Sequence, residues 1–177
     1  ATNVLLIGPP GVGKTHLAQS IGYEAIKQGF VVRYRSIFDL VADFLSEEAL
    51  AQRDRLLRGY LKPDLLIIDD MGLKQLPKHA GEYLLEVIMR RYETRATIMT
   101  SNRPLEDWGK LLGDVPTAGA ILDRFLHHAI TIPITAALIP VAVAVAGVAV
   151  AITIARITVT ITFAGCRVLS VSGVGRA

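Results

Sequence analysis

The sequence has little cysteine, and over most of its length it has no excess of either charge. Cys166 is the only cysteine, which excludes a disulfide-stabilised secreted domain and a cysteine-ligated zinc site. Acidic and basic residues balance over residues 1–129, so the formal net charge of +3 comes from Arg156, Arg167 and Arg176 in an acid-free tail. The basic isoelectric point therefore does not indicate a nucleic-acid-binding face.

The first residues also lack the basic segment of a signal peptide, so we expect a cytoplasmic location. Apolar residues make up 51% of the chain, which argues against intrinsic disorder. A length of 177 residues suits one ordinary domain with a real core.

Apolar runs and helical patterns alternate along the first 135 residues. Strands are predicted over residues 4–7, 31–34, 65–68, 96–100 and 129–132. Helices are predicted over residues 14–27, 39–58, 80–92 and 118–127, with Gly29 positioned to end the first. This order predicts an α/β fold with an open parallel sheet, helices on both faces and functional groups at the carboxyl ends of the strands.

The composition changes after about Thr135. No residue from Ala129 to Ala155 is charged, and Ala, Val, Ile and Thr dominate. Three interpretations remain open: a membrane anchor, although Pro133 and Pro140 interrupt the stretch; extra strands, since residues 158–162 alternate as a half-buried strand should; or an ending outside the selected fold, such as an out-of-frame one. We favour the last interpretation and consider membrane association the weakest of the three.

The strongest motif is Gly8-Pro9-Pro10-Gly11-Val12-Gly13-Lys14-Thr15, which matches the phosphate-loop pattern GxxxxGK followed by Ser or Thr. It lies between a predicted strand and a predicted helix, as this motif requires. Glycines let backbone N–H groups close around phosphates, Lys14 would neutralise the β- and γ-phosphates, and the Thr15 hydroxyl would bind Mg²⁺. The predicted nucleotide-binding residues are Gly8, Pro9, Pro10, Gly11, Val12, Gly13, Lys14, Thr15 and His16.

Polar residues at two further strand ends complete this pattern. Asp69 and Asp70 follow a buried strand; the first would help hold Mg²⁺ and the second would orient or deprotonate the attacking water. Asn102 follows the next strand, where its amide could hold that water, although it could equally form an Asx turn before Pro104. Asp70 and Asn102 are thus predicted catalytic residues.

Arg124 is the third predicted catalytic residue. Placed after the last sheet-covering helix, it could reach the γ-phosphate of a neighbouring subunit as an arginine finger, or it could form an ordinary surface ion pair. The adjacent His127 and His128 would point about 100° apart on a helix, so we do not expect them to share a metal.

These residues together resemble a known family. The segments GPPGVGKTHLA, LLIIDDMG, RRYETRATIMTSNRPLEDW and AILDRFLHHA, in this order, are similar to the IstB-like ATPases. These are AAA+ helper proteins of insertion-sequence transposition and relatives of the DnaC-type helicase loaders. The resemblance covers residues 1 to about 135, and it implies an AAA+ P-loop core without the family's N-terminal region, followed by the apolar tail at 136–177.

The resemblance implies an ATPase that uses ATP and Mg²⁺ and assembles on DNA as a ring or helical oligomer. It implies a transposase as partner, and weak, non-specific DNA binding is expected from the neutral charge balance. It makes Thr15 and Asp69 the metal-associated residues, Asp70 the hydrolytic acid, Asn102 the sensor and Arg124 the intersubunit finger. Two alternatives remain: a helicase loader with a replicative helicase as partner, and a nucleotide-gated scaffold with negligible hydrolysis.

Overall fold

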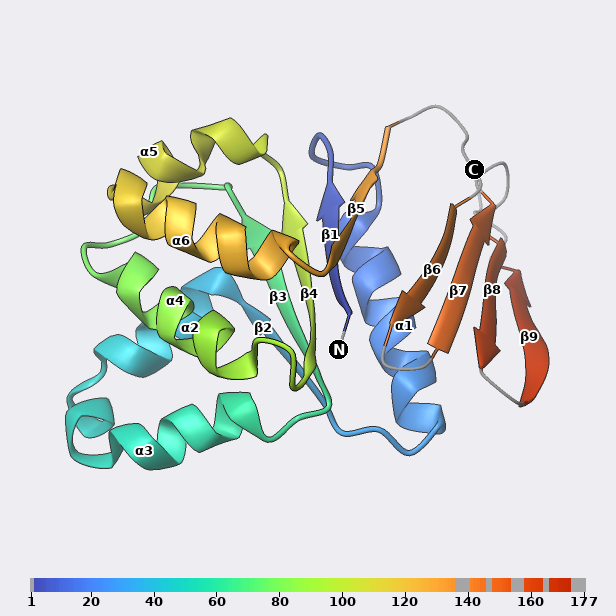
Figure 1. Ribbon diagram of the computed structural model, residues 1–177, viewed down its shortest axis with the longest axis horizontal. Helices are drawn as coiled ribbons and strands as arrows, with labels where there is room; N and C mark the ends of the chain where they lie inside the picture. The colour runs from blue at the N-terminus through green and yellow to red at the C-terminus, as the bar shows by residue number, and fades with distance from the viewer. Residues whose placement is uncertain (1, 136–140, 146–147, 154–157, 164–165, 173–177) are drawn as a thin grey trace.

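The structure, a computed structural model, describes residues 2–135, 141–145, 148–153, 158–163 and 166–172. Its strands form two sheets, one of five parallel strands and one of four antiparallel strands (Figure 1). The parallel sheet contains β1 (Asn3–Ile7), β2 (Val32–Ser36), β3 (Leu65–Met71), β4 (Ala96–Ser101) and β5 (Ala129–Pro133).

The strand order in the parallel sheet is β2-β3-β4-β1-β5, so β1 lies between β4 and β5. The loops that follow β1, β3 and β4 therefore meet at the carboxyl edge of the sheet, which is the upper edge in Figure 1. This arrangement confirms the predicted open parallel sheet, and it brings together residues that are far apart in the sequence.

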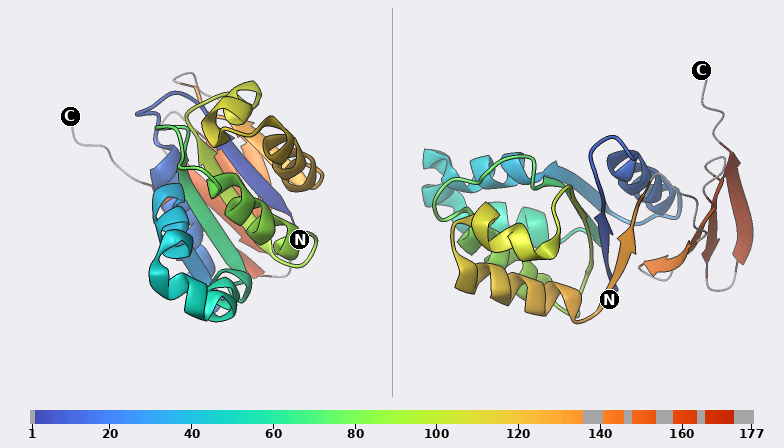
Figure 2. Two further views of the ribbon diagram at one scale, coloured as in Figure 1. Left: turned by 90° about the vertical axis from the view of Figure 1, so that its left-hand side faces the viewer. Right: turned by 90° about the horizontal axis from the view of Figure 1, so that it is seen from above.

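Helices cover both faces of this sheet (Figure 2). Among the helices in the described residues, α1 is the one that covers one face, through a core that includes Leu17, Ile21, Leu6 and Ile67. The opposite face packs against the remaining helices. The helices are α1 (Lys14–Lys27), α2 (Ile37–Leu45), α3 (Glu47–Leu61), α4 (Ala80–Arg91), α5 (Trp108–Leu112) and α6 (Val115–Leu126), with a 3₁₀ turn η1 (Leu105–Asp107) before α5.

The continuous apolar runs of the strands follow from this two-sided covering. In β1, Val4 and Leu6 face α1, whereas Leu5 belongs to the core on the opposite face, and all three are fully buried. Successive side chains of a strand point to opposite faces, so a strand that is covered on both sides is apolar at most positions.

The predicted single helix over residues 39–58 is wrong. Ser46 has extended backbone angles (φ −67°, ψ 146°), which end α2 and begin α3. The Ser36 hydroxyl accepts a hydrogen bond from the Asp39 backbone at 3.0 Å and caps α2, so that helix also starts earlier than expected. The apolar periodicity continues across Ser46 and hides the break.

Two smaller predictions also shift. The predicted helix over 118–127 begins at Val115, because the Pro116 position is compatible with a first turn. The segment around Trp108, which lies outside the predicted helices and strands, contains η1 and α5 and buries the Trp108 ring completely.

The second sheet contains β6 (Val141–Val145), β7 (Val148–Thr153), β8 (Thr158–Phe163) and β9 (Cys166–Ser172), paired in this order. The alternating pattern at residues 158–162, on which the extra-strand interpretation of the tail rested, coincides with β8. The interpretation of the tail as an ending outside the selected fold stays a prediction. The described part of the apolar stretch proposed as a membrane anchor consists of strands. None of the helices in the described residues is long and apolar enough to cross a membrane.

Candidate nucleotide-binding site

The phosphate-loop motif connects β1 to α1 at the carboxyl edge of the sheet. Gly11 and Gly13 have positive φ angles of 80° and 88°, a conformation that disfavours residues with a side chain. Gly13 lies directly before α1, so the unpaired N–H groups of the first helical turn and the positive end of the helix dipole face the loop. A loop of this form is suited to bind an anion.

Lys14 is buried beneath the loop. Its Nζ donates hydrogen bonds to the carbonyl oxygens of Gly8 at 2.8 Å and Pro9 at 2.7 Å. Burial lowers the pKa of Lys14, whereas the nearby charges of Asp69 and Asp70 oppose that shift. The ammonium group is therefore held next to the loop and close to two carboxylates.

Asp69 is fully buried at the end of β3 and is held by hydroxyl groups from three other elements. Its Oδ1 accepts hydrogen bonds from Thr15 Oγ1 at 3.2 Å and from Thr100 Oγ1, and its Oδ2 accepts one from the Tyr34 hydroxyl at 2.5 Å. Burial, together with the Asp69 hydrogen bond, raises the pKa of Tyr34 to about 12, so Tyr34 keeps its proton and donates. Thr15 and Asp69, the predicted metal-associated pair, are thus in direct contact.

Asp70 adopts a left-handed backbone (φ 68°) where the pairing of β3 with β4 shifts register. Neighbouring residues of a regular strand point to opposite faces, but an irregularity of this kind re-aims a side chain. The Asp70 backbone N–H donates to Thr100 Oγ1 at 3.0 Å, and the side chain lines a cavity beside Lys14. Burial and then the charge of Asp69 raise the pKa of Asp70, against the effect of Lys14.

This cavity lies between the phosphate loop and the ends of β3 and β4. Its volume is about 420 Å³, within the usual range for small-molecule sites. Asn102 belongs to its wall, and the Asn102 backbone N–H donates to the Met71 carbonyl at 2.9 Å, which ties the end of β4 to β3. The lining residues are Pro10, Gly11, Gly13, Lys14, Thr15, His16, Gln19, Asp70, Leu73 and Asn102.

Not every predicted nucleotide-binding residue lines this cavity. Gly8 and Pro9 provide the carbonyl groups that hold Lys14, and Val12 packs against the core beneath α1. His16 is exposed on the cavity wall, and Asp69 lies beneath the surface in contact with Thr15.

The structure does not bring Arg124 to this cavity. Arg124 lies in the last turn of α6, and β5, which follows α6, begins beside Asn3 at the start of β1. The phosphate loop follows the other end of β1, and a five-residue strand spans about 16 Å. The Arg124 guanidinium instead lies over the Tyr92 ring, 5.4 Å from its centre, and Nε is 3.8 Å from Asp123 Oδ2.

Sequence reasoning did not identify Tyr34 and Thr100, the two other residues that hold Asp69. Thr100 had a visible signal, because it begins a polar run, Thr100-Ser101-Asn102, at a strand end. Tyr34 had only its position as the last residue of the predicted strand over residues 31–34, and the pairing of β2 with β3 is what brings its hydroxyl to Asp69.

Comparison with known proteins identifies close relatives of this chain. Residues 1–138 match the family described as IstB-like ATP binding protein. A relative from Geobacillus stearothermophilus, named as an ATP-binding protein of insertion sequence IS5376, is 45% identical over 128 residues, which cover 72% of this chain and 51% of the relative. A relative from Pseudomonas aeruginosa, named for insertion sequence IS21, is 38% identical over 132 residues, covering 75% and 50%.

Solved structures share the fold. The AMPPCP-bound DnaA of Aquifex aeolicus superposes with a TM-score of 0.62 at 26% identity, covering 76% of this chain and 41% of DnaA. The DnaC helicase loader superposes with a TM-score of 0.62 at 24% identity, covering 76% and 78%. At that identity, the likeness to DnaC concerns the fold alone.

The fold is therefore that of a P-loop AAA+ core, as the sequence predicted. The chain spans about half the length of the curated relatives it matches. Since the family match extends over residues 1–138, well beyond half of the chain, this protein belongs to the IstB-like ATP binding protein family.

Proposed function

We propose that this chain is the ATPase core of a helper protein for insertion-sequence transposition, and that it hydrolyses ATP with Mg²⁺. The observation that carries this proposal is the contact between Thr15 and Asp69 beneath a cavity lined by Lys14, Asp70 and Asn102. Phosphate binding, metal binding and water activation each have a residue of suitable chemistry there.

The donor set fits Mg²⁺. Thr15 Oγ1 and Asp69 Oδ1 are hard oxygen ligands that lie 3.2 Å apart, and Mg²⁺ prefers such ligands together with phosphate oxygens and water. A bound Mg²⁺ would neutralise the negative charge that develops on the phosphates during transfer. Tyr34 and Thr100 keep the Asp69 carboxylate in one orientation through their hydroxyl groups.

Asp70 and Asn102 are suited to act on the attacking water. The raised pKa of Asp70 makes its carboxylate a better proton acceptor than an ordinary aspartate. Lys14 would leave the carbonyl groups of Gly8 and Pro9 and bind phosphate oxygens, which are stronger acceptors for its charge.

Arg124 would act on a neighbouring subunit. Because it lies at the opposite edge of the sheet from the cavity of its own chain, only another copy can bring an equivalent arginine to the γ-phosphate. Its guanidinium is half exposed and is held by Tyr92, with Asp123 as a distant ionic partner, so it is available at the surface. Hydrolysis would then depend on assembly.

The DNA and transposase roles rest on the relatives, which are named for insertion sequences. The near-neutral charge of residues 1–129 leads us to expect weak, non-specific DNA binding that ATP strengthens and salt weakens. Pull-down experiments with the cognate transposase and with a replicative helicase separate the transposition role from a helicase-loader role, since only the true partner should be retained in the presence of ATP.

The decisive experiment separates ATP binding from ATP turnover. Lys14→Ala should weaken ATP binding about 10- to 100-fold, as expected for the loss of a charge-assisted hydrogen bond. Asp70→Asn should bind ATP normally and stop phosphate release, because Asp70 acts on water rather than on the bound nucleotide. Lys110→Ala, at an exposed position away from the cavity, is the matched control and should change neither quantity.

Equal ATP affinity of Lys14→Ala and the unmodified chain would contradict the assignment of the phosphate site. ATP binding without DNA-stimulated turnover in the unmodified, assembled chain would instead favour the nucleotide-gated scaffold.

A further inference from the structure

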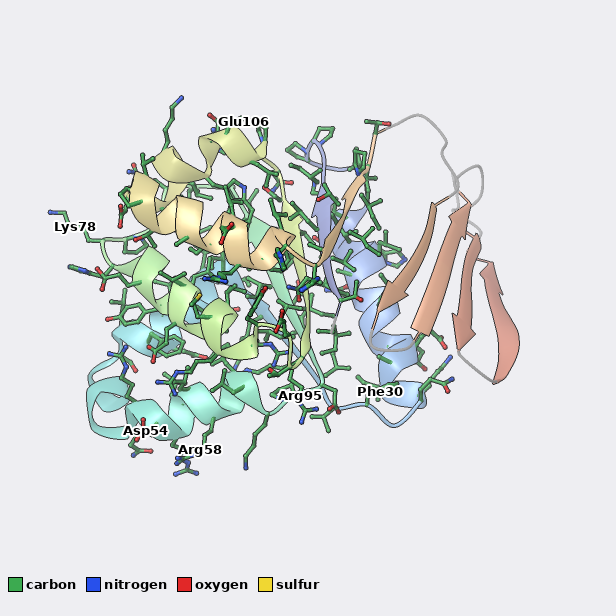
Figure 3. The ribbon with its side chains drawn as sticks, in the orientation of Figure 1. Phe30, Asp54, Arg58, Lys78, Arg95 and Glu106 are labelled. Carbon is green, nitrogen blue, oxygen red and sulfur yellow. The ribbon has the colours of Figure 1, made fainter. Side chains whose placement is uncertain are left out.

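Glu93, His127 and His128 gather at the amino edge of the parallel sheet, opposite the nucleotide cavity. Glu93 lies in the turn between α4 and β4, and the two histidines lie in the turn between α6 and β5. Arg95, which follows Glu93 by two residues, lies at the lower edge in Figure 3, whereas Glu106 of η1 lies at the upper edge. The separation of the two edges makes this cluster independent of the nucleotide site.

The three side chains present their ligand atoms to one another. His128 Nε2 is 3.0 Å from His127 Nδ1 and 3.2 Å from Glu93 Oε1, and all three atoms lie within 4.8 Å of one another. Ligand atoms about 2.0–2.1 Å from a tetrahedral zinc ion lie about 3.3–3.5 Å apart. The observed separations therefore need only small side-chain movements to surround such an ion.

The expectation that His127 and His128 could not share a metal assumed that both belong to a regular helix. In the structure α6 ends at Leu126, so the two residues lie in the turn beyond it. Their rings meet edge to face, with centres 4.2 Å apart, and this brings the two nitrogens together. Two facing imidazole nitrogens at this distance can share one proton or bind one cation.

The backbone beneath the cluster is fixed. The Asn3 side chain accepts a hydrogen bond from the Thr97 backbone N–H at 3.1 Å and donates one to the Phe125 carbonyl at 3.2 Å. The Asn3 backbone N–H donates to the His128 carbonyl at 3.1 Å. One buried asparagine thus ties β1 to His128, to the end of α6 and to the start of β4, which follows the turn of Glu93. Such backbone contacts near the ligands reduce the entropy lost when a metal binds.

We propose that Glu93, His127 and His128 bind one divalent transition-metal ion, of which zinc is the best match. Two imidazoles and one carboxylate form a ligand set that zinc uses, and such a set leaves a fourth position for water. The Tyr92 hydroxyl, now 2.8 Å from His127 Nδ1, would turn away from that nitrogen when the metal binds.

The site lies next to Arg124, whose guanidinium lies over the Tyr92 ring, 5.4 Å from its centre. The carboxylates of Glu93 and Asp123 supply negative charge that offsets the positive charges of the metal ion and of Arg124. A metal ion would therefore fix the surface on which Arg124 is displayed, although metal binding itself does not depend on the proposed ATPase function.

The test is a titration of the untagged full chain with Co²⁺ and then Zn²⁺, without nucleotide and with excess Mg²⁺ to occupy oxygen sites. We expect one equivalent of Co²⁺ to produce visible d–d absorption. Zn²⁺ should then displace the bound Co²⁺, and the absorption should disappear. No intense thiolate charge-transfer band should appear, because Cys166 is not a ligand in this site.

Two variants locate the ion. The first variant is His128→Gln, because His128 contacts both other ligands. It should weaken metal binding at least about tenfold, since even the loss of a residue that only orients a metal ligand costs about 10- to 100-fold in metal affinity. Glu93→Gln should act in the same direction. His79→Gln is the matched control, because exposed His79 pairs with Glu82 at 2.9 Å but has no second histidine beside it, and binding should be unchanged.

Circular dichroism and ATP binding verify that each variant is folded, since the cluster is exposed and distant from the phosphate loop. The proposal is overturned if the folded chain shows no saturable Co²⁺ binding. It is also overturned if His128→Gln and Glu93→Gln bind as tightly as the parent, or if the spectrum shows thiolate ligation.

Discussion

Asp70 combines a partly buried carboxyl group with a left-handed backbone, and both features reduce stability. An acid whose pKa is raised by folding favours the folded state while both states are protonated. That contribution is lost as the pH rises through the folded-state pKa, because the unfolded chain ionises first. At neutral pH the Asp70 carboxylate therefore opposes folding.

We accordingly expect Asp70→Asn to melt at a higher temperature than the parent at pH 7. Asparagine tolerates the left-handed backbone and carries no charge. The difference in melting temperature should vanish at pH values below 3.8, the ordinary pKa of an aspartate, because both chains are then uncharged at this position. Thermal unfolding at several pH values measures this, with the exposed residue change Glu106→Gln as control. A lower melting temperature at pH 7 would contradict it.

Arg91 is a buried arginine that connects three segments on one side of the sheet. It donates hydrogen bonds to Thr97 Oγ1 at 3.0 Å and to the carbonyl groups of Tyr60, Pro63 and Ala96 at 2.6–2.9 Å. Burial lowers the pKa of Arg91 to about 10, so it stays charged at neutral pH. Where α3 leads into β3, the guanidinium donates to backbone carbonyl groups in place of backbone N–H groups.

Arg91→Met should lower the free energy of unfolding by about 3 kcal/mol or more, because several buried carbonyl groups lose their donors at about 1–3 kcal/mol each. Urea denaturation measures the change. The neighbouring exposed Arg90, which pairs with Glu86 at 2.9 Å, provides the control: Arg90→Met should cost about 0.5 kcal/mol. Similar losses for both variants would show that the Arg91 hydrogen bonds contribute little.

At the scale of single elements, glycine has opposite effects at a helix end and inside a helix. Gly29 follows α1 with a φ of 87°, as the sequence predicted for a helix stop. Gly119 lies inside α6 with open space where a Cβ would be, and no positive φ. The backbone at Gly29 requires glycine. At Gly119, glycine only increases the conformational entropy that the chain loses when it folds.

Replacing each glycine by alanine should therefore change stability in opposite directions. Gly29→Ala should destabilise the fold by about 1–2 kcal/mol through left-handed strain, and Gly119→Ala should stabilise it by about 0.5–1 kcal/mol. Parallel urea unfolding curves measure both. If both substitutions shift the midpoint in the same direction, the assignment of these two backbone conformations is wrong.

At the scale of the whole molecule, the two edges of the parallel sheet carry different groups. The carboxyl edge holds the phosphate loop, Asp69 and Asp70, and the amino edge holds Arg124 and the proposed metal ligands. In the proposed mechanism, a second copy of the chain is needed to bring Arg124 to a nucleotide cavity. Subunit mixing therefore tests the proposed assembly directly.

Arg124→Ala should bind ATP normally but hydrolyse it about 10³-fold more slowly, as expected for a lost arginine finger. Mixed with Asp70→Asn, it should regain activity, because some interfaces then combine an intact Asp70 from one chain with an intact Arg124 from the other. Phosphate release at varied mixing ratios measures this. Activity that stays at the level of the separate variants at every ratio would rule out a finger supplied in trans.

Much of the parallel sheet could be predicted because β1, β3 and β4 are buried on both faces and read as largely apolar runs, whereas the edge strands β2 and β5 are only partly buried. Helix boundaries were less accurate: the periodicity of residues 39–58 continued through Ser46, although the backbone does not. The phosphate loop, Asp70 and Asn102 could be placed at one edge because parallel strands end together. That argument works only for residues directly at strand ends.

The sequence by itself determined the phosphate loop, since its backbone geometry depends on consecutive residues from Gly8 to Thr15. Only the tertiary structure decided what holds Asp69, because Tyr34 and Thr100 reach it from other strands. It also decided that Arg124 lies away from its own cavity. Likewise, Glu93 meets His128, 35 residues later, because β4 and β5 both flank β1 and bring their preceding turns to the same edge.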